Sequence, residues 1–337
     1  MAADNSIEIL DLRHFPAPVL RPVLEAESEV WRQRLHWDYR GSSKLLMQYI
    51  DSHMLPGYAA LESGKVTGYT FCVYEESKAV IGDVFAMQGA GPETVNGALP
   101  AYDVEETLLR HLLETLLNSP QVDRIESQLL LHPAGAHGEL FLEAGFRLYP
   151  RLFMVQQLSG HWSRPLEPLP GRRGDPAHLE LRAWRDEDLP AASHLISEAY
   201  HGHPDSLIND QYHSPQGSLR FLHNIVRYSG CGVFSALASH VVVDRASREL
   251  VALVLGSRVS PESGHVTQLC VHPAYRRQGM ARLLLAAAAA QFVRQGVAEV
   301  SLTVTEANRD AIDLYEAEGY QCRHRFDAAV WQRYEKA

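Results

Sequence analysis

Between residues 178 and 337, short apolar runs typical of strands alternate with longer stretches that have helical periodicity. Short runs rich in valine and leucine predict strands at residues 178–183, 235–243, 250–259, 266–271 and 300–305. Longer amphipathic or alanine-rich stretches predict helices at residues 186–199, 216–228, 279–294 and 308–317. Two short strands are predicted to close the chain. Strands that alternate with helices after an initial meander indicate a mixed α/β sheet.

The first 160 residues show a similar order of elements. The pattern predicts a hairpin at 58–62 and 65–74, a strand at 79–86, a helix at 104–117 and an apolar run from residue 122. Both halves also end in similar segments. Leu140–Phe146 and Leu314–Tyr320 each place an aromatic ring four residues before a glycine that precedes another ring. The match predicts a domain-sized duplication.

A segment without helical or strand periodicity separates the two halves. Residues 160–178 contain four prolines and three glycines. We therefore predict one domain at residues 1–160, a linker at 161–177 and a second domain at 178–337.

Composition and charge exclude several classes of protein. The 337 residues carry 31 basic and 41 acidic side chains, a net charge of −10, which disfavours binding to nucleic acid by phosphate neutralisation. No apolar run approaches the ~20 residues of a membrane helix, and we expect no secretory signal. Four scattered cysteines form no CxxC pair, so we expect reduced thiols, no metal site and a cytoplasmic protein.

The segment Leu269–Arg282 is the strongest candidate for a ligand site. A strand ends at Val271, and two arginines and Gly279 then lead into a long helix. The first N–H groups of a helix lack internal partners and lie at the positive end of its dipole, so they suit an anion. Arg276 and Arg277 suit a diphosphate, and Gly279 lets an oxygen approach the backbone. The alternative is a basic, solvated helix start.

These residues carry a resemblance to a known family. Arg276-x-x-Gly279-x-Ala281, after a strand ending in Val271-x-Pro273, resembles the acetyl-CoA pyrophosphate motif of the GNAT superfamily of N-acetyltransferases. Residues 308–320, with Asn308, Leu314-Tyr315 and Gly319-Tyr320, resemble its downstream signature. The motifs cover residues 264–323, and the whole chain resembles tandem-GNAT proteins, a group that includes mycothiol synthase. The implied fold is α/β, with two tandem GNAT-like domains, each a central mixed β-sheet flanked by helices.

The resemblance implies acetyl-CoA as co-substrate and a set of binding residues. Two strands would splay apart, with the pantetheine arm in the wedge and the pyrophosphate on backbone amides after the strand. Asn308 would bind the cofactor near the mouth of the wedge, or act only as a helix N-cap. The implied cofactor-binding residues are Leu269, Cys270, Val271, Arg276, Arg277, Gln278, Gly279, Met280, Ala281 and Asn308.

The same resemblance implies direct acetyl transfer to a primary amine, without a cysteine nucleophile. Tyr315 would be the general acid that protonates the departing thiolate, the alternative being a core aromatic. Many family members carry a glutamate base on the strand before the loop, which is missing here. His265 is the best substitute for that base, although an exposed histidine at a strand start is an equally good interpretation.

The acceptor would be a small-molecule or peptide amine. Residues 200–213 contain histidines, two tyrosines, Asp205 and Asp210, which could receive a cationic acceptor or form a polar loop. The His201-Gly202-His203 spacing is too weak to indicate a metal. The sequence leaves monomer and homodimer open.

The first half lacks the motifs of the second. It has no Arg-x-x-Gly-x-Ala sequence, residues 87–102 replace the loop, and Ala134 and Phe141 stand at the positions of Asn308 and Tyr315. We therefore expect a degenerate domain that binds no acetyl-CoA. Its aromatic residues at 31, 37 and 39 could line a surface but are better explained as core. The rival function is a non-catalytic acyl-CoA-binding scaffold or sensor.

Overall fold

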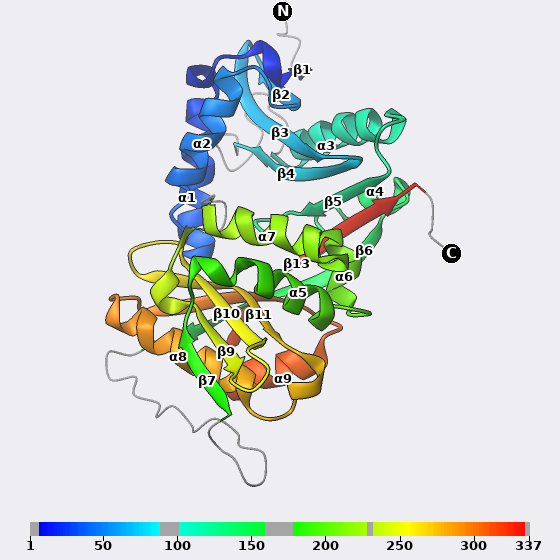
Figure 1. The fold of residues 1–337 in the computed structure, drawn as a ribbon. Helices are drawn as coiled ribbons and strands as arrows, with labels where there is room; N and C mark the ends of the chain where they lie inside the picture. The colour runs from blue at the N-terminus through cyan, green and yellow to red at the C-terminus, as the bar shows by residue number, and fades with distance from the viewer. Residues whose placement is uncertain (1–6, 88–100, 159–177, 228–231, 334–337) are drawn as a thin grey trace, which may run out of the picture. The chain divides into compact units, whose positions relative to one another are not determined.

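The computed structural model describes residues 7–87, 101–158, 178–227 and 232–333 (Figure 1). The chain forms two compact units that are each discontinuous in sequence. The first unit comprises Met1–Leu35, Tyr39–Pro150 and Phe326–Ala337, and the second comprises His36–Asp38 and Arg151–Arg325. From the sequence we predicted a division between residues 1–160 and 178–337. The linker predicted at 161–177 lies outside the described residues, as do residues 88–100 of the loop at 87–102.

The second unit is built on a mixed sheet with helices on both faces. Its strands are β6 (Arg147–Gln157, from Arg151 on), β7 (Leu179–Ala183), β8 (Val233–Phe234), β9 (His240–Asp244), β10 (Leu250–Arg258), β11 (Ser263–Val271), β12 (Glu299–Thr305) and the start of β13 (Gln321–Gln332). Its helices are α5 (Leu189–Ala199), α6 (Pro204–Ile208), α7 (Pro215–Arg227), α8 (Met280–Arg294) and α9 (Arg309–Ala317).

Neighbouring strands in this sheet follow the order β6-β12-β11-β10-β9-β7. Helices α8 and α9 share one hydrophobic cluster with the sheet, and α5 and α7 share another (Figure 1). Small residues let α8 pack closely on the strands. A Cβ atom at Gly256 or Gly264 would come within 2.8 Å of the Phe292 ring, so both strands need glycine beneath that ring.

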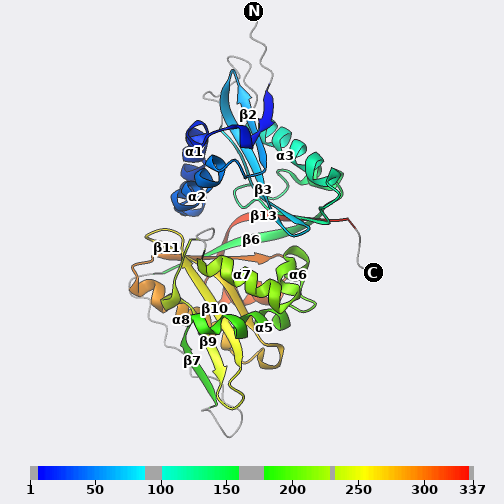
Figure 2. The same cartoon turned by 45° about the horizontal axis from the view of Figure 1, so that its top comes forward.

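The first unit has a similar arrangement. Its strands β1 (Glu8–Asp11), β2 (Gly57–Glu62), β3 (Lys65–Glu75), β4 (Lys78–Ala86) and β5 (Arg124–Gln128) are neighbours in chain order. Helices α1 (Ala17–Leu35) and α2 (Arg40–Asp51) lie on one side of the sheet, and α3 (Ala101–Asn118) lies on the other (Figure 2). The short helix α4 (Gly138–Glu143) follows β5.

Strand pairing connects each unit to a distant part of the sequence. Strand β6 follows the elements of the first unit but pairs with β12 from Glu299↔Gln157 to Thr305↔Arg151. The end of the chain pairs with β5 from Ala328↔Gln128 to Gln332↔Arg124. Because β13 runs unbroken over twelve residues, the predicted pair of short closing strands is wrong. Residues 321–332 contain no glycine or proline, so no residue that commonly breaks a strand divides this segment into two.

The other element predictions hold, with local differences. The strand expected at 235–243 begins only at His240, because Ala236–Ala238 form a 3-10 turn capped by Ser235. Trp31 and Trp37 are each 7 % exposed, in agreement with the core interpretation. Cys72, Cys270 and Cys322 are free thiols, while Cys231 lies outside the described residues. Within the part of the chain that the structure describes, no helix is long and apolar enough to cross a bilayer.

Candidate active site

Two neighbouring parallel strands of the second unit separate halfway along their length. Strand β11 pairs with β10 as far as Val271, but it pairs with β12 only from Ser263 to Val266. The register with β10 shifts between Val266 and Gln268, which leaves Thr267 as a bulge. Beyond the bulge, no ladder pair joins β11 to β12 among the described residues. A strand edge without a partner strand can pair with an extended ligand.

The residues predicted to face the cofactor lie on this separated part of β11. The Leu269 carbonyl accepts a hydrogen bond from the Tyr200 hydroxyl at 3.4 Å. Cys270 is 6 % exposed, and burial raises the pKa of its thiol far above the ordinary range. A buried neutral thiol is a poor nucleophile, which agrees with the expectation that Cys270 does not attack the substrate.

The loop after β11 exposes the N-terminus of α8. Arg277 and Gly279 both have left-handed backbone, with φ of 61° and 82°. No side chain caps the first turn of α8, and a Cβ atom at Gly279 would meet no other atom within 4 Å. The first N–H groups of α8 therefore border open space. This arrangement suits a diphosphate at the positive end of a helix.

The two arginines of this loop, Arg276 and Arg277, differ in their contacts. The Arg276 guanidinium donates to the Ala199 carbonyl at 2.7 Å and to the Val271 carbonyl at 3.3 Å, which ties the loop to the ends of α5 and β11. Arg277 is exposed. Arg276 thus stabilises the conformation of the loop through these bonds. Arg277 lies at the surface beside the start of α8. Gln278 is also exposed, Met280 is buried and Ala281 is half-buried.

Helix α9 brings Asn308 and Tyr315 to the same unit. The Asn308 side-chain oxygen accepts from the Ala311 N–H at 3.3 Å, so it caps the helix, and its Nδ2 lies 3.2 Å from His203 Nε2. Tyr315 is 8 % exposed and packs against Tyr320, with ring centroids 5.8 Å apart. Its hydroxyl has no hydrogen-bond partner within the described residues, and burial, strengthened by the charge of Asp205, raises its pKa. The phenol therefore stays protonated.

The segment from residue 200 to 213 supplies a carboxylate and two further phenols. Asp205 accepts a hydrogen bond from the Thr305 hydroxyl at the end of β12. The Tyr200 and Tyr212 rings stack with centroids 4.4 Å apart, and the Tyr212 hydroxyl donates to Gln268 Oε1 at 3.4 Å. Burial raises the pKa of both phenols, and the Asp205 charge raises each further. The charge of Asp205 thus acts on three tyrosines, including Tyr315.

His265 lies in the part of β11 that is still paired with β12. The Ser301 hydroxyl donates to the Gly264 carbonyl at 3.1 Å, so we assign the proton to His265 Nδ1, which donates to Ser301 Oγ at 2.9 Å. The ring packs edge-on against Trp37. Burial, with a smaller effect of Arg151, lowers the His265 pKa to about 3. A base this weak does little to deprotonate an ammonium group.

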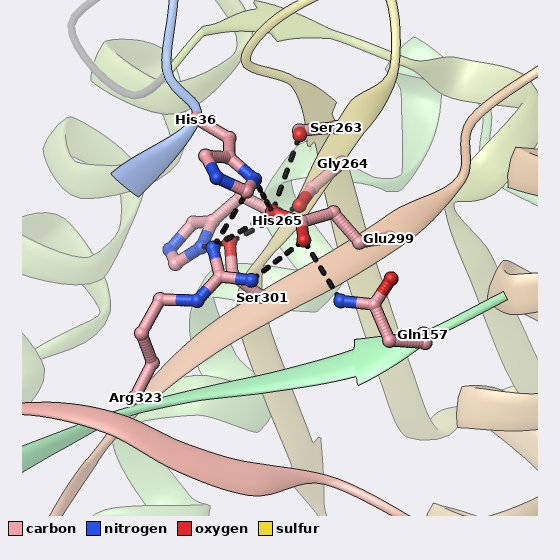
Figure 3. A network of polar contacts seen from close by, with 8 residues as sticks. All are labelled: His36, Gln157, Ser263, Gly264, His265, Glu299, Ser301 and Arg323. Carbon is pink, nitrogen blue, oxygen red and sulfur yellow. Dashed lines mark hydrogen bonds and ion pairs between the residues drawn. The ribbon is translucent and has the colours of Figure 1, made fainter. Parts of the chain in front are cut away.

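A buried carboxylate organises the same region of the second unit (Figure 3). Glu299 accepts hydrogen bonds from both terminal nitrogens of Arg323, at 2.9 and 2.7 Å, and from Gln157 Nε2 at 2.9 Å. His36 Nδ1 lies 3.0 Å from the other carboxylate oxygen. Burial alone would raise the Glu299 pKa, but the bonds from Arg323 and Gln157 outweigh it and lower that pKa. The network holds β6 and the start of β13 against β12.

The first unit contains the same strand separation, but side chains close it. Strand β4 pairs with β5 only from Lys78 to Ile81, and its register with β3 shifts across Gly82. Beyond this bulge, the Val84 N–H donates to Asp83 Oδ1 at 2.8 Å and the Val84 carbonyl accepts from His132 Nε2 at 2.9 Å. The Ala86 N–H donates to Glu105 Oε1 at 3.1 Å. The backbone groups that a ligand would need are therefore already bonded.

Residues 182–320 match the family model described as acetyltransferase (GNAT) family. Over these residues the chain is similar to the GNAT family. A comparison with curated proteins found no match.

Solved structures extend the GNAT likeness over nearly the whole chain. A GCN5-related N-acetyltransferase from Sphaerobacter thermophilus is 15 % identical, with a TM-score of 0.64 and coverage of 99 % of this chain and 97 % of that one. A tandem GNAT protein from the clavulanic acid biosynthesis pathway is 14 % identical, with a TM-score of 0.57 and coverage of 98 % and 100 %. A glucosamine N-acetyltransferase region of a fungal GH3 β-N-acetylglucosaminidase is 12 % identical, with a TM-score of 0.62 and coverage of 98 % and 38 %. At these identities the likeness concerns the fold, which is that of tandem GNAT proteins.

The strand and helix residues of the predicted site lie on β11, α8 and α9, the elements expected from the sequence. The closed wedge of the first unit and the Glu299 network were not predicted. Both depend on side chains that are far apart in sequence, such as Glu105 with His132 and Glu299 with Arg323. No local spacing marks such pairs.

Proposed function

We propose that this protein is an acetyl-CoA-dependent N-acetyltransferase whose second unit moves acetyl to a primary amine by direct attack. The observation that carries the proposal is the free edge of β11 beyond Val266, next to the uncapped N-terminus of α8 at Gly279. The edge suits the amides of pantetheine, and the helix start suits its diphosphate. Bound acetyl-CoA would supply an activated thioester carbonyl.

The residues of the chain would divide the binding of this co-substrate between strand and loop. Backbone groups of Leu269, Cys270 and Val271 would pair with the pantetheine arm. N–H groups from Arg277 to Ala281 would bind the diphosphate, with the exposed Arg277 guanidinium adding positive charge. Asn308 would line the mouth of the wedge from the start of α9.

The first unit would bind no acetyl-CoA. Its wedge is closed by Asp83, His132 and Glu105, which already bond to the Val84 and Ala86 backbone. A pantetheine arm would have to displace three side chains and leave buried polar groups unpaired, which costs about 1–3 kcal/mol each. We therefore expect one acetyl-CoA site per chain.

Tyr315 would act as the general acid that protonates the departing thiolate. Its phenol stays protonated and its hydroxyl is unbonded within the described residues, so the proton is available. We expect Tyr315→Phe to lower kcat by about 10- to 100-fold, because a positioned acid contributes at least that much, while KM for acetyl-CoA stays unchanged. Release of CoA with a panel of primary amines measures both constants.

Tyr320→Phe is the matched control, because it removes a hydroxyl from the neighbouring buried ring. Equal activity of Tyr315→Phe and the wild type would remove the acid role. The same panel tests the proposed reaction itself. If no amine drives CoA release over many turnovers, an acyl-CoA-binding scaffold replaces the enzyme.

Asp205 would attract the amine in its ammonium form, and the proton that the amine loses would leave through water. The charge of Asp205 acts on Tyr315, whereas the pKa of His265, about 3, makes that ring a weak base. Asp205→Asn keeps an oxygen for the Thr305 hydroxyl but loses the charge. We expect kcat/KM for the amine to fall by about tenfold or more, with little change in KM for acetyl-CoA.

Asp210→Asn provides the control for Asp205→Asn, since it removes a carboxylate from the same segment. Steady-state kinetics at several pH values would compare the two variants with the wild type. A similar loss in both variants would mean that the net charge of the segment matters, and Asp205 would lose its special role.

A further inference from the structure

Three side chains with metal-binding atoms converge in the first unit. They are Glu105 on α3, His132 in the loop after β5, and His137 just before α4. His132 Nδ1 lies 3.3 Å from His137 Nε2 and 3.6 Å from Glu105 Oε2, and His137 Nε2 lies 3.7 Å from the same oxygen. Three atoms at these spacings can all lie about 2.1 Å from one central ion, the usual distance of zinc from nitrogen or oxygen ligands.

The other polar atoms of His132 and Glu105 hold these two side chains in the required orientation. His132 Nε2 donates to the Val84 carbonyl at 2.9 Å, so its Nδ1 carries the lone pair that points to the cluster. Glu105 Oε1 accepts from the Ala86 N–H at 3.1 Å, which leaves Oε2 for a metal. Metal-binding histidines commonly donate their second nitrogen to a backbone carbonyl in this way.

Burial and charge also favour a cation at this point. The His137 side chain is 2 % exposed, and the Glu105 and His132 side chains are each 12 % exposed. A neutral imidazole is the form that binds metal. A bound cation would offset the cost of an ionised, buried carboxylate.

The charged groups around the cluster are unevenly distributed. Glu27 and Asp83 are buried nearby, and each interacts electrostatically with the other and with Glu105. Arg34 is the cation whose charge lowers the Glu105 pKa.

We propose that Glu105, His132 and His137 bind one divalent transition-metal ion, zinc in preference to magnesium or calcium. Imidazole nitrogens suit zinc, whereas magnesium and calcium prefer oxygen ligands. Two histidines and one carboxylate leave a fourth position for water. The ion would join α3 to the loop after β5 and keep the wedge of the first unit closed. From the sequence we expected no metal site, and no local spacing indicates this one, because Glu105 is distant in sequence from the histidine pair.

The test begins with the full chain, which avoids dependence on any variant. After removal of metal with a chelator, the protein is titrated with zinc against a chromophoric chelator, and its zinc content is measured by mass spectrometry. We expect one tightly bound zinc per chain. X-ray absorption is expected to show two imidazoles and light-atom ligands without sulfur. Sulfur ligation would place the ion at a cysteine, such as the exposed Cys322, and would overturn the proposal.

Variants then locate the ion. Glu105→Gln and His137→Gln each remove one ligand, and we expect zinc affinity to fall by about 100-fold or more. His111→Gln changes an exposed histidine on the same helix α3 and is the control. Equal affinity in all variants, or the absence of stoichiometric binding to the wild type, would refute the site. Should a variant fail to fold, Co²⁺ absorption bands of a four-coordinate site in the wild type give the deciding result, and six-coordinate bands count against it.

Discussion

Gly279→Asp is expected to abolish acetyl-CoA binding. The wild type is expected to bind one equivalent in a calorimetric titration, and the variant none. Aspartate tolerates the left-handed backbone that Gly279 adopts at φ 82°, so the chain still folds. The new carboxylate would stand in the open space beside the first N–H groups of α8, where it would repel a diphosphate and compete for the same donors. We expect kcat/KM for acetyl-CoA to fall by about 100-fold or more, which corresponds to about 2.7 kcal/mol.

Gly296→Asp is the control for this substitution. Gly296 follows the other end of α8, has φ of 78° and also has no atom within 4 Å of its would-be Cβ. The two variants therefore share the backbone strain and the added charge but differ in their place relative to the loop. If both bind acetyl-CoA as the wild type does, the diphosphate site lies elsewhere. Two equivalents bound to the wild type would contradict the closed wedge of the first unit.

Arg323→Leu is expected to destabilise the second unit by about 3 kcal/mol, because it removes a bidentate partner from the buried Glu299 carboxylate. Glu299 is 5 % exposed, so water cannot easily replace the guanidinium. Gln157 and His36 still contact the carboxylate and prevent a larger loss. Denaturant unfolding, followed by circular dichroism, measures the change in free energy of unfolding.

The effect of Arg323→Leu should also depend on pH in one direction. The network lowers the Glu299 pKa in the folded protein, so its contribution is fully present above the unfolded pKa of about 4.3. That contribution is lost as the pH falls through the folded-state pKa, and the difference between wild type and variant should shrink there. Arg245→Leu, which removes a surface ion pair with Glu180, should cost less than about 1 kcal/mol. Equal losses in the two variants would contradict the role of the network.

Much of the second unit follows from local sequence. Short apolar runs located β10 and β11, and the alanine-rich run located α8, because such runs are stable only when they are buried in a core. The spacing of Arg276, Gly279 and Ala281 also predicted the loop at the start of α8. These features depend on neighbours within a few residues, which is why they can be predicted.

Other features require contacts that no local pattern contains. Arg276 was expected to bind a diphosphate, yet its guanidinium bonds to carbonyls of Ala199 and Val271. His265 was expected at a strand start where it could act as a base, but the Trp37 ring from a distant segment helps to bury it. Side chains near in space and far in sequence set both outcomes.

The exchange of final strands has a consequence for synthesis of the chain. The first unit lacks its last strand until residues 328–332 are made, because these are the residues that pair with β5. The second unit, in turn, takes residues 151–157 from the part made earlier. The first unit can therefore be completed only when synthesis of the chain is nearly finished. Until then, the edge of β5 that pairs with residues 328–332 has no partner strand. Separate expression of the two halves would therefore remove one strand from each unit.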